Sequence, residues 1–209
     1  MIRIGCGSGF WGDSAAGPAQ LVRQGKIDFL VLDYLAEITM SILSRAKQKK
    51  PELGYATDFV DTMMAPLARE IAEKKIKVVA NAGGVNPRGC GEALARALAK
   101  QGVDLKIAVV LGDDVQPQIP ALRERGAKNL ETGGAIPEAL ISANAYLGAK
   151  PIADALKLGA DVVITGRCVD SAVALGPLIA TFGWKMDDWD KLAMGSLAGH
   201  VIECGVQAT

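Results

Sequence analysis

The stretch DVVITGRCVDSAVALGPL, residues 161–178, joins a short apolar run to a polar turn and then to a segment with helical spacing. The run Val162–Thr165 is mostly β-branched and lacks polar alternation, which is typical of a strand covered on both faces. Ser171–Thr181, directly after the turn, has the spacing of a helix. A buried strand that leads into a helix predicts an α/β fold.

Similar strand and helix patterns alternate along the rest of the chain. The other apolar runs are Ile2–Cys6, Phe29–Asp33, Ile76–Ala80, Ile107–Leu111 and Ala143–Leu147. The other segments with helical spacing are Leu35–Lys47, Asp58–Lys74, Gly91–Gln101 and Lys150–Lys157, and residues 182–200 indicate a loop and one more helix. This alternation predicts a mostly parallel sheet with helices on both faces, doubly wound and Rossmann-like. A partial (β/α) barrel is the alternative, because six strands can belong to a set of eight.

Length and charge narrow the class of protein. The chain has 209 residues, of which 50% are apolar, and this suits one α/β domain over residues 1–209. Its 23 basic and 23 acidic residues cancel, so no overall field draws the chain to nucleic acid or to an anionic membrane. No signal peptide and no apolar stretch of about 18–20 residues is apparent. We expect a cytoplasmic protein without nucleic-acid or membrane partners.

The cysteines and the single histidine give little indication of disulfides or of a metal site. Cys6, Cys90, Cys168 and Cys204 are far apart and form no CxxC pair, which indicates free thiols in a reducing compartment. His200 and Cys204 supply at most half of a zinc site, because the other ligands would have to be distant cysteines. We therefore expect no metal.

A glycine-rich loop follows the first predicted strand, at the end where parallel α/β folds bind ligands. Gly5, Gly7 and Gly9 allow backbone N–H groups to approach an anion closely. The spacing GCGSGFWG departs from G-x-G-x-x-G, because Phe10 stands in place of the third glycine, and no Walker lysine follows. Anion binding and a plain tight turn are both open for this loop, and a nucleotide-binding module is disfavoured.

Polar side chains also follow the third and the last predicted strands. In NAGGVNP, Asn81 leaves the strand end, and Gly83 and Gly84 permit close approach of the backbone to a ligand. In TGRCVDS, Arg167 offers a guanidinium that can clamp a carboxylate or phosphate. Asp170 can orient that guanidinium, cap the next helix or act as a general base. We expect Asp170 to take part in catalysis. The residues that we expect to bind a ligand or cofactor are Asn81, Gly83, Gly84 and Arg167.

Three further pairs of polar residues are candidates for chemistry. Asp33 and Glu37 stand four apart where the second strand ends, so they can divide acid and base roles, share a metal, or serve as a helix cap and a first-turn acid. Asp113–Asp114 allows the same interpretations. His200 lies three residues before Glu203, and a histidine beside a carboxylate is a candidate proton-transfer group near neutral pH, with a structural histidine as the alternative. Of these we take Asp33, His200 and Glu203 as candidate catalytic residues.

Six motifs that contain most of these residues occur in one order along the chain. They are GCGSGFWGD (5–13), LVLDYLAE (30–37), VVANAGGVNP (78–87), YLGAKPIADALKLGADVVITGRCVDSAVALGPL (146–178), FGW (182–184) and GHVIECGVQAT (199–209). In this order they resemble the acyclic terpene utilisation (AtuA) family, and the long fourth motif is the specific one. The resemblance implies a longer protein, in which the last motif continues into a further carboxyl-terminal region and residues 1–209 are the amino-terminal part.

The resemblance also implies a function. Members of the family are associated with bacterial breakdown of citronellol, geraniol and related branched acids through CoA thioesters. We expect an enzyme that binds a small carboxylate or acyl-CoA and catalyses proton-transfer chemistry of the hydratase, lyase or isomerase type. The alternative is a non-catalytic accessory subunit that binds a partner enzyme of CoA-thioester catabolism. The cofactor stays unknown, and we expect a homo-oligomer or contact with the carboxyl-terminal region.

Overall fold

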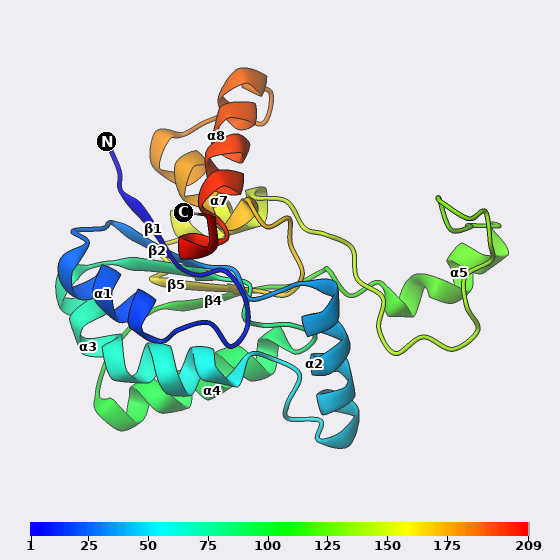
Figure 1. The fold of residues 1–209 in the computed structure, drawn as a ribbon, viewed down its shortest axis with the longest axis horizontal. Helices are drawn as coiled ribbons and strands as arrows, with labels where there is room; N and C mark the ends of the chain where they lie inside the picture. Colours follow the sequence, from blue (N-terminus) through cyan, green and yellow to red (C-terminus); the bar gives the residue numbers. More distant parts are fainter. Residues whose placement is uncertain (209) are drawn as a thin grey trace.

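Five parallel strands form one open sheet in the order β1-β2-β3-β5-β4 (Figure 1). The structure is a computed structural model that describes residues 1–208, and Thr209, the last residue of the predicted domain, lies outside them. The strands are β1 (Ile4–Ser8), β2 (Phe29–Leu32), β3 (Lys77–Ala80), β4 (Ile107–Val110) and β5 (Val162–Thr165). They confirm the predicted parallel α/β architecture.

Side chains that alternate along the strands supply two hydrophobic cores, one on each face of the sheet. Leu30 of β2 and Val162 of β5 lie in the first core, whereas Val31 and Val163 lie in the second. Both strands are buried along their whole length. Burial on two faces explains why these strands are continuous apolar runs rather than alternating ones.

Helices cover both faces of the sheet, as the doubly wound prediction requires (Figure 1). The core on one face includes residues of α1 (Ala16–Gln24), α3 (Ala65–Lys74) and α4 (Pro87–Gln101). The core on the other face includes residues of α6 (Lys150–Lys157) and α7 (Ala172–Phe182). Four of these helices match the predicted segments apart from their ends. The sequence patterns do not indicate α1, a short helix that contains a glycine and a proline.

The remaining helical segments lie at the margins of the sheet. α2 (Glu37–Lys49) follows β2, and a π-helical turn, Phe59–Met64, leads into α3. α8 (Trp189–Ile202) packs on α7, and Gly205–Ala208 forms a 3-10 turn against β1. None of the helices in residues 1–208 is long and apolar enough to cross a membrane.

The order of the strands creates a switch point between β3 and β5. After β3 the chain skips one position in the sheet to form β4. It then returns, so that β5 lies between β3 and β4. As a result α4, which follows β3, and α7, which follows β5, lie on opposite faces of the sheet. In open α/β sheets ligands bind beyond the carboxyl ends of the strands at such a point. The alternative of a partial barrel is wrong, because it requires β4 to lie beside β3.

The predicted strand Ala143–Leu147 is also wrong. This segment makes only isolated bridges, between Asn144 and Asp114 and between Leu147 and Cys168. It closes a long excursion between β4 and α6 that contains α5 (Ile119–Glu124), and Figure 1 shows α5 standing away from the sheet. In this segment the side chains of Asn144 and Tyr146 form hydrogen bonds with Asp113 and Arg167, and the backbone makes no continuous pairing with a strand.

Candidate functional site

The carboxyl ends of β2 and β3 hold a buried pair of polar side chains. Asp33 and Asn81 come directly after these neighbouring strands, and only 5% of Asp33 and 0% of Asn81 is exposed. The Asn81 amide nitrogen Nδ2 donates a hydrogen bond of 2.5 Å to Asp33 Oδ1. The Asn81 oxygen accepts a 2.6 Å hydrogen bond from the backbone N–H of Tyr34. Both ends of the amide are therefore used to fix the carboxyl group.

Burial raises the pKa of Asp33 to about 7. The hydrogen bond from Asn81 opposes this shift, because it stabilises the charged form of the carboxyl group. The negative charges of Asp170 and Glu203 raise the pKa of Asp33 further. The result is a carboxyl group that can give or take a proton near neutral pH, as acid–base catalysis requires.

A buried guanidinium lies beyond the carboxyl end of β5. Arg167 Nη1 donates to Asp170 Oδ1 at 2.6 Å and to the backbone oxygens of Leu35 at 3.0 Å and Cys168 at 3.2 Å. Burial disfavours the charge, but the hydrogen bonds to Asp170 and Tyr146 raise the pKa of Arg167, so it stays cationic. Arg167 therefore ties the loops after β2 and β5 together.

The outer edge of the guanidinium is covered by two exposed side chains. The ring of Tyr146 stacks over Arg167 with its centroid 4.1 Å from Cζ, and the phenol oxygen accepts from Nη2 at 2.9 Å. The Tyr146 hydroxyl in turn donates to the Glu37 carboxylate, which lies 3.5 Å from Arg167 Nη2. The hydrogen bond from Tyr146 lowers the pKa of Glu37, although 82% of this side chain is exposed. Sequence reasoning did not single out Tyr146, which lies 109 residues from Glu37 along the chain.

Glu203 brings the end of the described chain to the same edge of the sheet. Its Oε1 pairs with His200 Nδ1 at 2.8 Å, and its backbone oxygen accepts from Cys6 Sγ at 3.2 Å. The second carboxylate oxygen, Oε2, is buried and has no hydrogen-bond partner among residues 1–208. Burial raises the pKa of Glu203, while its exposed partner His200 lowers it. A ligand with a hydroxyl or amide donor could satisfy Oε2.

The predicted glycine residues mostly face the protein's own chain. A Cβ atom on Gly5 or Gly7 would touch core side chains, and one on Gly9 would lie 2.6 Å from the backbone oxygen of Cys204. A Cβ atom on Gly83 would lie 2.5 Å from the Thr165 oxygen, and Gly83 N–H donates to that oxygen at 3.0 Å. Close approach of backbone to backbone explains these glycines. Anion binding by them stays a prediction.

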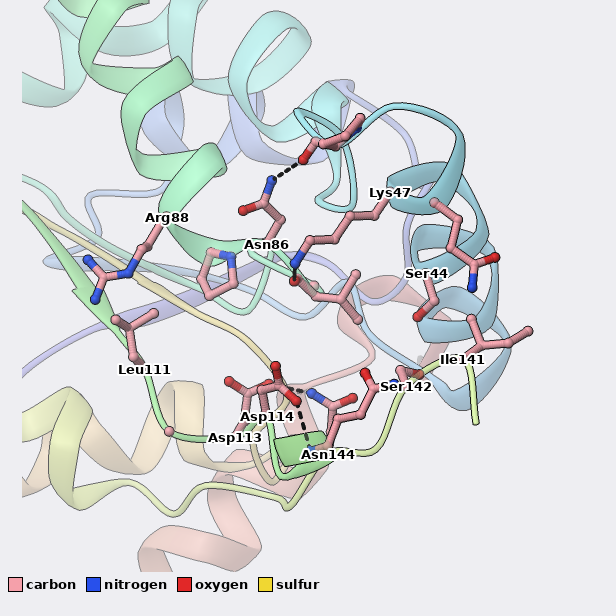
Figure 2. A pocket seen from close by; sticks show the side chains of 17 residues that line it. Ser44, Lys47, Asn86, Arg88, Leu111, Asp113, Asp114, Ile141, Ser142 and Asn144 are labelled. Atoms are coloured by element: carbon pink, nitrogen blue, oxygen red, sulfur yellow. Dashed lines mark hydrogen bonds between the residues drawn. The ribbon is translucent and has the colours of Figure 1, made fainter. Parts of the chain in front are cut away.

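Gly84, the last predicted glycine, lines a cavity, and its φ of +53° favours glycine. The cavity has a volume of about 640 Å³ and lies between α2, the first turn of α4 and the loop after β4 (Figure 2). Asp33, Asn81 and Arg167 are not among its lining residues. Asp113 connects this cavity to the loop that carries Arg167. It lines the cavity, and its Oδ2 accepts from the backbone N–H of Arg167 at 2.8 Å.

The model of the acyclic terpene utilisation family protein AtuA matches residues 2–209. The chain belongs to the AtuA family. Membership implies a role in acyclic terpene utilisation. No curated protein matches this chain.

In this AtuA-family chain, five predicted site residues gather at one edge of the sheet: Asp33, Asn81, Arg167, Asp170 and Glu203. His200 lies at the exposed rim through its bond to Glu203, whereas Gly5 and Gly7 pack against the core on the α1 side. No group of three or more histidine, cysteine or acidic side chains in the described residues is arranged to hold a metal ion. The gathered groups combine a proton donor or acceptor, a fixed cation and a spare buried acceptor.

Proposed function

We propose that this chain is an enzyme of acyclic terpene utilisation that binds a small carboxylate or acyl thioester and moves a proton on it. Hydratase, lyase and isomerase reactions all need such a step. The observation that carries the proposal is the buried Asp33 carboxyl group, held by Asn81 and with its pKa raised to about 7. Such a group is present in both protonation states at neutral pH and can act as acid and as base.

Asn81 supports this role by its direction of hydrogen bonding. Its amide donates to Asp33, so it stabilises the carboxylate that remains after Asp33 has given up its proton. The same amide cannot rotate without breaking its bond to the N–H of Tyr34. Asp33 is thus held in one position through both halves of a proton-transfer cycle.

Arg167 is the group we propose for the substrate's negative charge. Its Nη1 is used by Asp170 and by backbone oxygens, whereas its outer nitrogen Nη2 donates to Tyr146 at 2.9 Å and meets the exposed Glu37 at only 3.5 Å. A contact of this length with a solvent-exposed partner contributes little to stability. A substrate carboxylate can take the place of the Glu37 side chain there, where it accepts from Arg167 Nη2 and from the Tyr146 hydroxyl.

Solvent deuterium exchange tests the proposal without knowledge of the product. The protein is incubated in D₂O with branched unsaturated carboxylates and their thioesters, such as dimethylacrylate, and exchange at carbon is followed by NMR. We expect exchange on one class of compound, reduced by about a hundredfold or more in Asp33→Asn. Asp61→Asn, a change of an exposed aspartate in the π-helical turn Phe59–Met64, serves as the control. Equal exchange by the wild type and Asp33→Asn would exclude the role of Asp33.

A non-catalytic accessory subunit is the second candidate, and α8 favours it. Met194, Leu197 and Val201 follow one another at helical spacing and are more than half exposed, at 66%, 56% and 60%. Exposed apolar stripes of this kind often mark a surface for another protein. This candidate predicts no exchange by the isolated chain and full activity only when a partner enzyme is added.

A further inference from the structure

Two cations that form no ion pair with any residue from 1 to 208 line the cavity between α2 and α4. The ammonium group of Lys47, on α2, donates a hydrogen bond to the backbone oxygen of Val85 at 2.6 Å. Arg88, in the first turn of α4, is exposed and makes no hydrogen bond or ion pair with any residue from 1 to 208. Figure 2 shows both side chains on the walls of the cavity.

The facing wall is rich in hydrogen-bonding groups. Asp113 is buried and accepts a hydrogen bond from the amide of Asn144 at 2.9 Å, whereas Asp114 is exposed and accepts from the backbone N–H of Gln116 at 3.0 Å. Ser142 lies beside them on the same wall (Figure 2). The cavity therefore has a cationic side and a side that can accept hydrogen bonds from hydroxyl or amide groups.

We propose that this cavity binds the phosphate group of an organic phosphate. Lys47 and Arg88 hold the phosphate, and Asp114 and Ser142 meet hydroxyl or amide groups on the rest of the ligand. A phosphate fits two separate cations better than a carboxylate does, because it carries more charge and more acceptor oxygens. The volume of about 640 Å³ lies within the range of about 300–1,000 Å³ that is usual for small-molecule sites.

The proposal goes beyond the proton transfer assigned to Asp33 and does not depend on it. Organic phosphates reach a protein from several sources, among them nucleotides, sugar phosphates and phosphorylated thioester carriers. All of them share a phosphate joined to a body with hydroxyl or amide donors. The binding experiment therefore uses adenosine monophosphate, ribose phosphate and coenzyme A as separate probes, together with inorganic phosphate.

Isothermal titration calorimetry on the whole chain tests the site. We expect at least one organic phosphate to bind, and Arg88→Ala and Lys47→Met each to weaken its binding about tenfold or more. Arg96→Ala and Lys49→Met remove the same charges from the same two helices outside the cavity and should leave affinity within about twofold. Asp114→Asn should weaken the organic probes and spare inorganic phosphate.

The outcomes separate this site from the proposed enzyme activity. Asp33→Asn should bind the organic phosphate as the wild type does, even if it has lost deuterium exchange. The proposal is overturned if no organic phosphate binds, if inorganic phosphate binds as tightly as all of them, or if both cation variants retain full affinity. Because Arg88 is exposed, Arg88→Ala should fold normally, and its thermal melt checks this.

Discussion

Asn81 donates a 2.5 Å hydrogen bond to the buried carboxyl group of Asp33 across the carboxyl ends of β3 and β2. The bond joins the end of β2 to the end of β3, which is one of the two strands at the switch point of the sheet. It places a group that titrates near neutral pH where open α/β sheets bind their ligands.

The first prediction concerns stability and pH. The folded chain holds the Asp33 proton up to a pKa of about 7, whereas the ordinary value is 3.8. Between these two values the folded state binds more protons than the unfolded state, so this group's contribution to the free energy of unfolding falls as pH rises. At about 1.4 kcal/mol per unit of pKa, the loss over the whole interval is on the order of 4 kcal/mol by pH 8.

Asp33→Asn removes this pH dependence. The stability of the variant relative to the wild type should increase from pH 4 to pH 7, between the two pKa values above, in urea unfolding measured across the range. An unchanged pH profile of the difference would contradict the raised pKa. Asp61→Asn, which lies at an exposed position, should follow the wild type throughout.

The second prediction concerns Asn81→Ala. The change leaves the carboxyl group of Asp33 and the N–H of Tyr34 without their hydrogen bonds in a buried place. We expect a loss of about 1–3 kcal/mol in the free energy of unfolding and a further rise of the Asp33 pKa. Asn129→Ala in the exposed segment after α5 should cost less, about 0.5 kcal/mol, because water replaces its bonds.

The third prediction concerns the contact between the glycine loop and the end of the described chain. In Gly9→Ala the added methyl group would lie 2.6 Å from the Cys204 oxygen, so residues 203–205 have to move and Cys6 loses its bond to Glu203. Burial raises the pKa of Cys6 to about 11, so exposure should increase its labelling by a thiol reagent about tenfold or more. Gly148→Ala, with open space around the site of substitution, is the control, and equal labelling of Cys6 in both variants would refute the contact.

The fourth prediction concerns the exposed carboxylate beside Arg167. Glu37→Gln removes the charge that competes with a substrate carboxylate for the guanidinium, so small carboxylates should bind about three- to tenfold more tightly. Calorimetry with dimethylacrylate measures this change. Glu73→Gln, at an exposed position on α3, should not alter affinity. Weaker binding by Glu37→Gln would mean that Glu37 helps to hold the ligand and does not stand in its place.

Periodicity alone predicts most of the sheet, because the buried strands are apolar on both faces. Ala143–Leu147 misleads for a local reason. It is as apolar as a strand, but Asn144 binds Asp113 and Tyr146 covers Arg167, so the backbone follows polar contacts instead of a neighbouring strand. No pattern within five residues distinguishes these two cases.

The sequence likewise predicts only part of the candidate site. That Asp33, Asn81 and Arg167 lie at one edge follows from their positions after parallel strands. The two hydrogen bonds of the Asn81 amide, to Asp33 and from Tyr34, depend on the register between β2 and β3, which the sequence does not display. That Lys47 and Arg88 line one cavity likewise depends on how α2 and α4 are placed, which the sequence does not display.

A carbon-13 NMR titration of the Asp33 carboxyl group tests the central claim most directly. The resonance is assigned by its absence in Asp33→Asn and followed from acid to alkaline pH. We expect a midpoint near pH 7, and a higher midpoint in Asn81→Ala, because the hydrogen bond from Asn81 lowers the pKa of Asp33. A midpoint close to the ordinary 3.8 would contradict it, since Asp33 would then be a plain carboxylate at neutral pH with no proton to transfer.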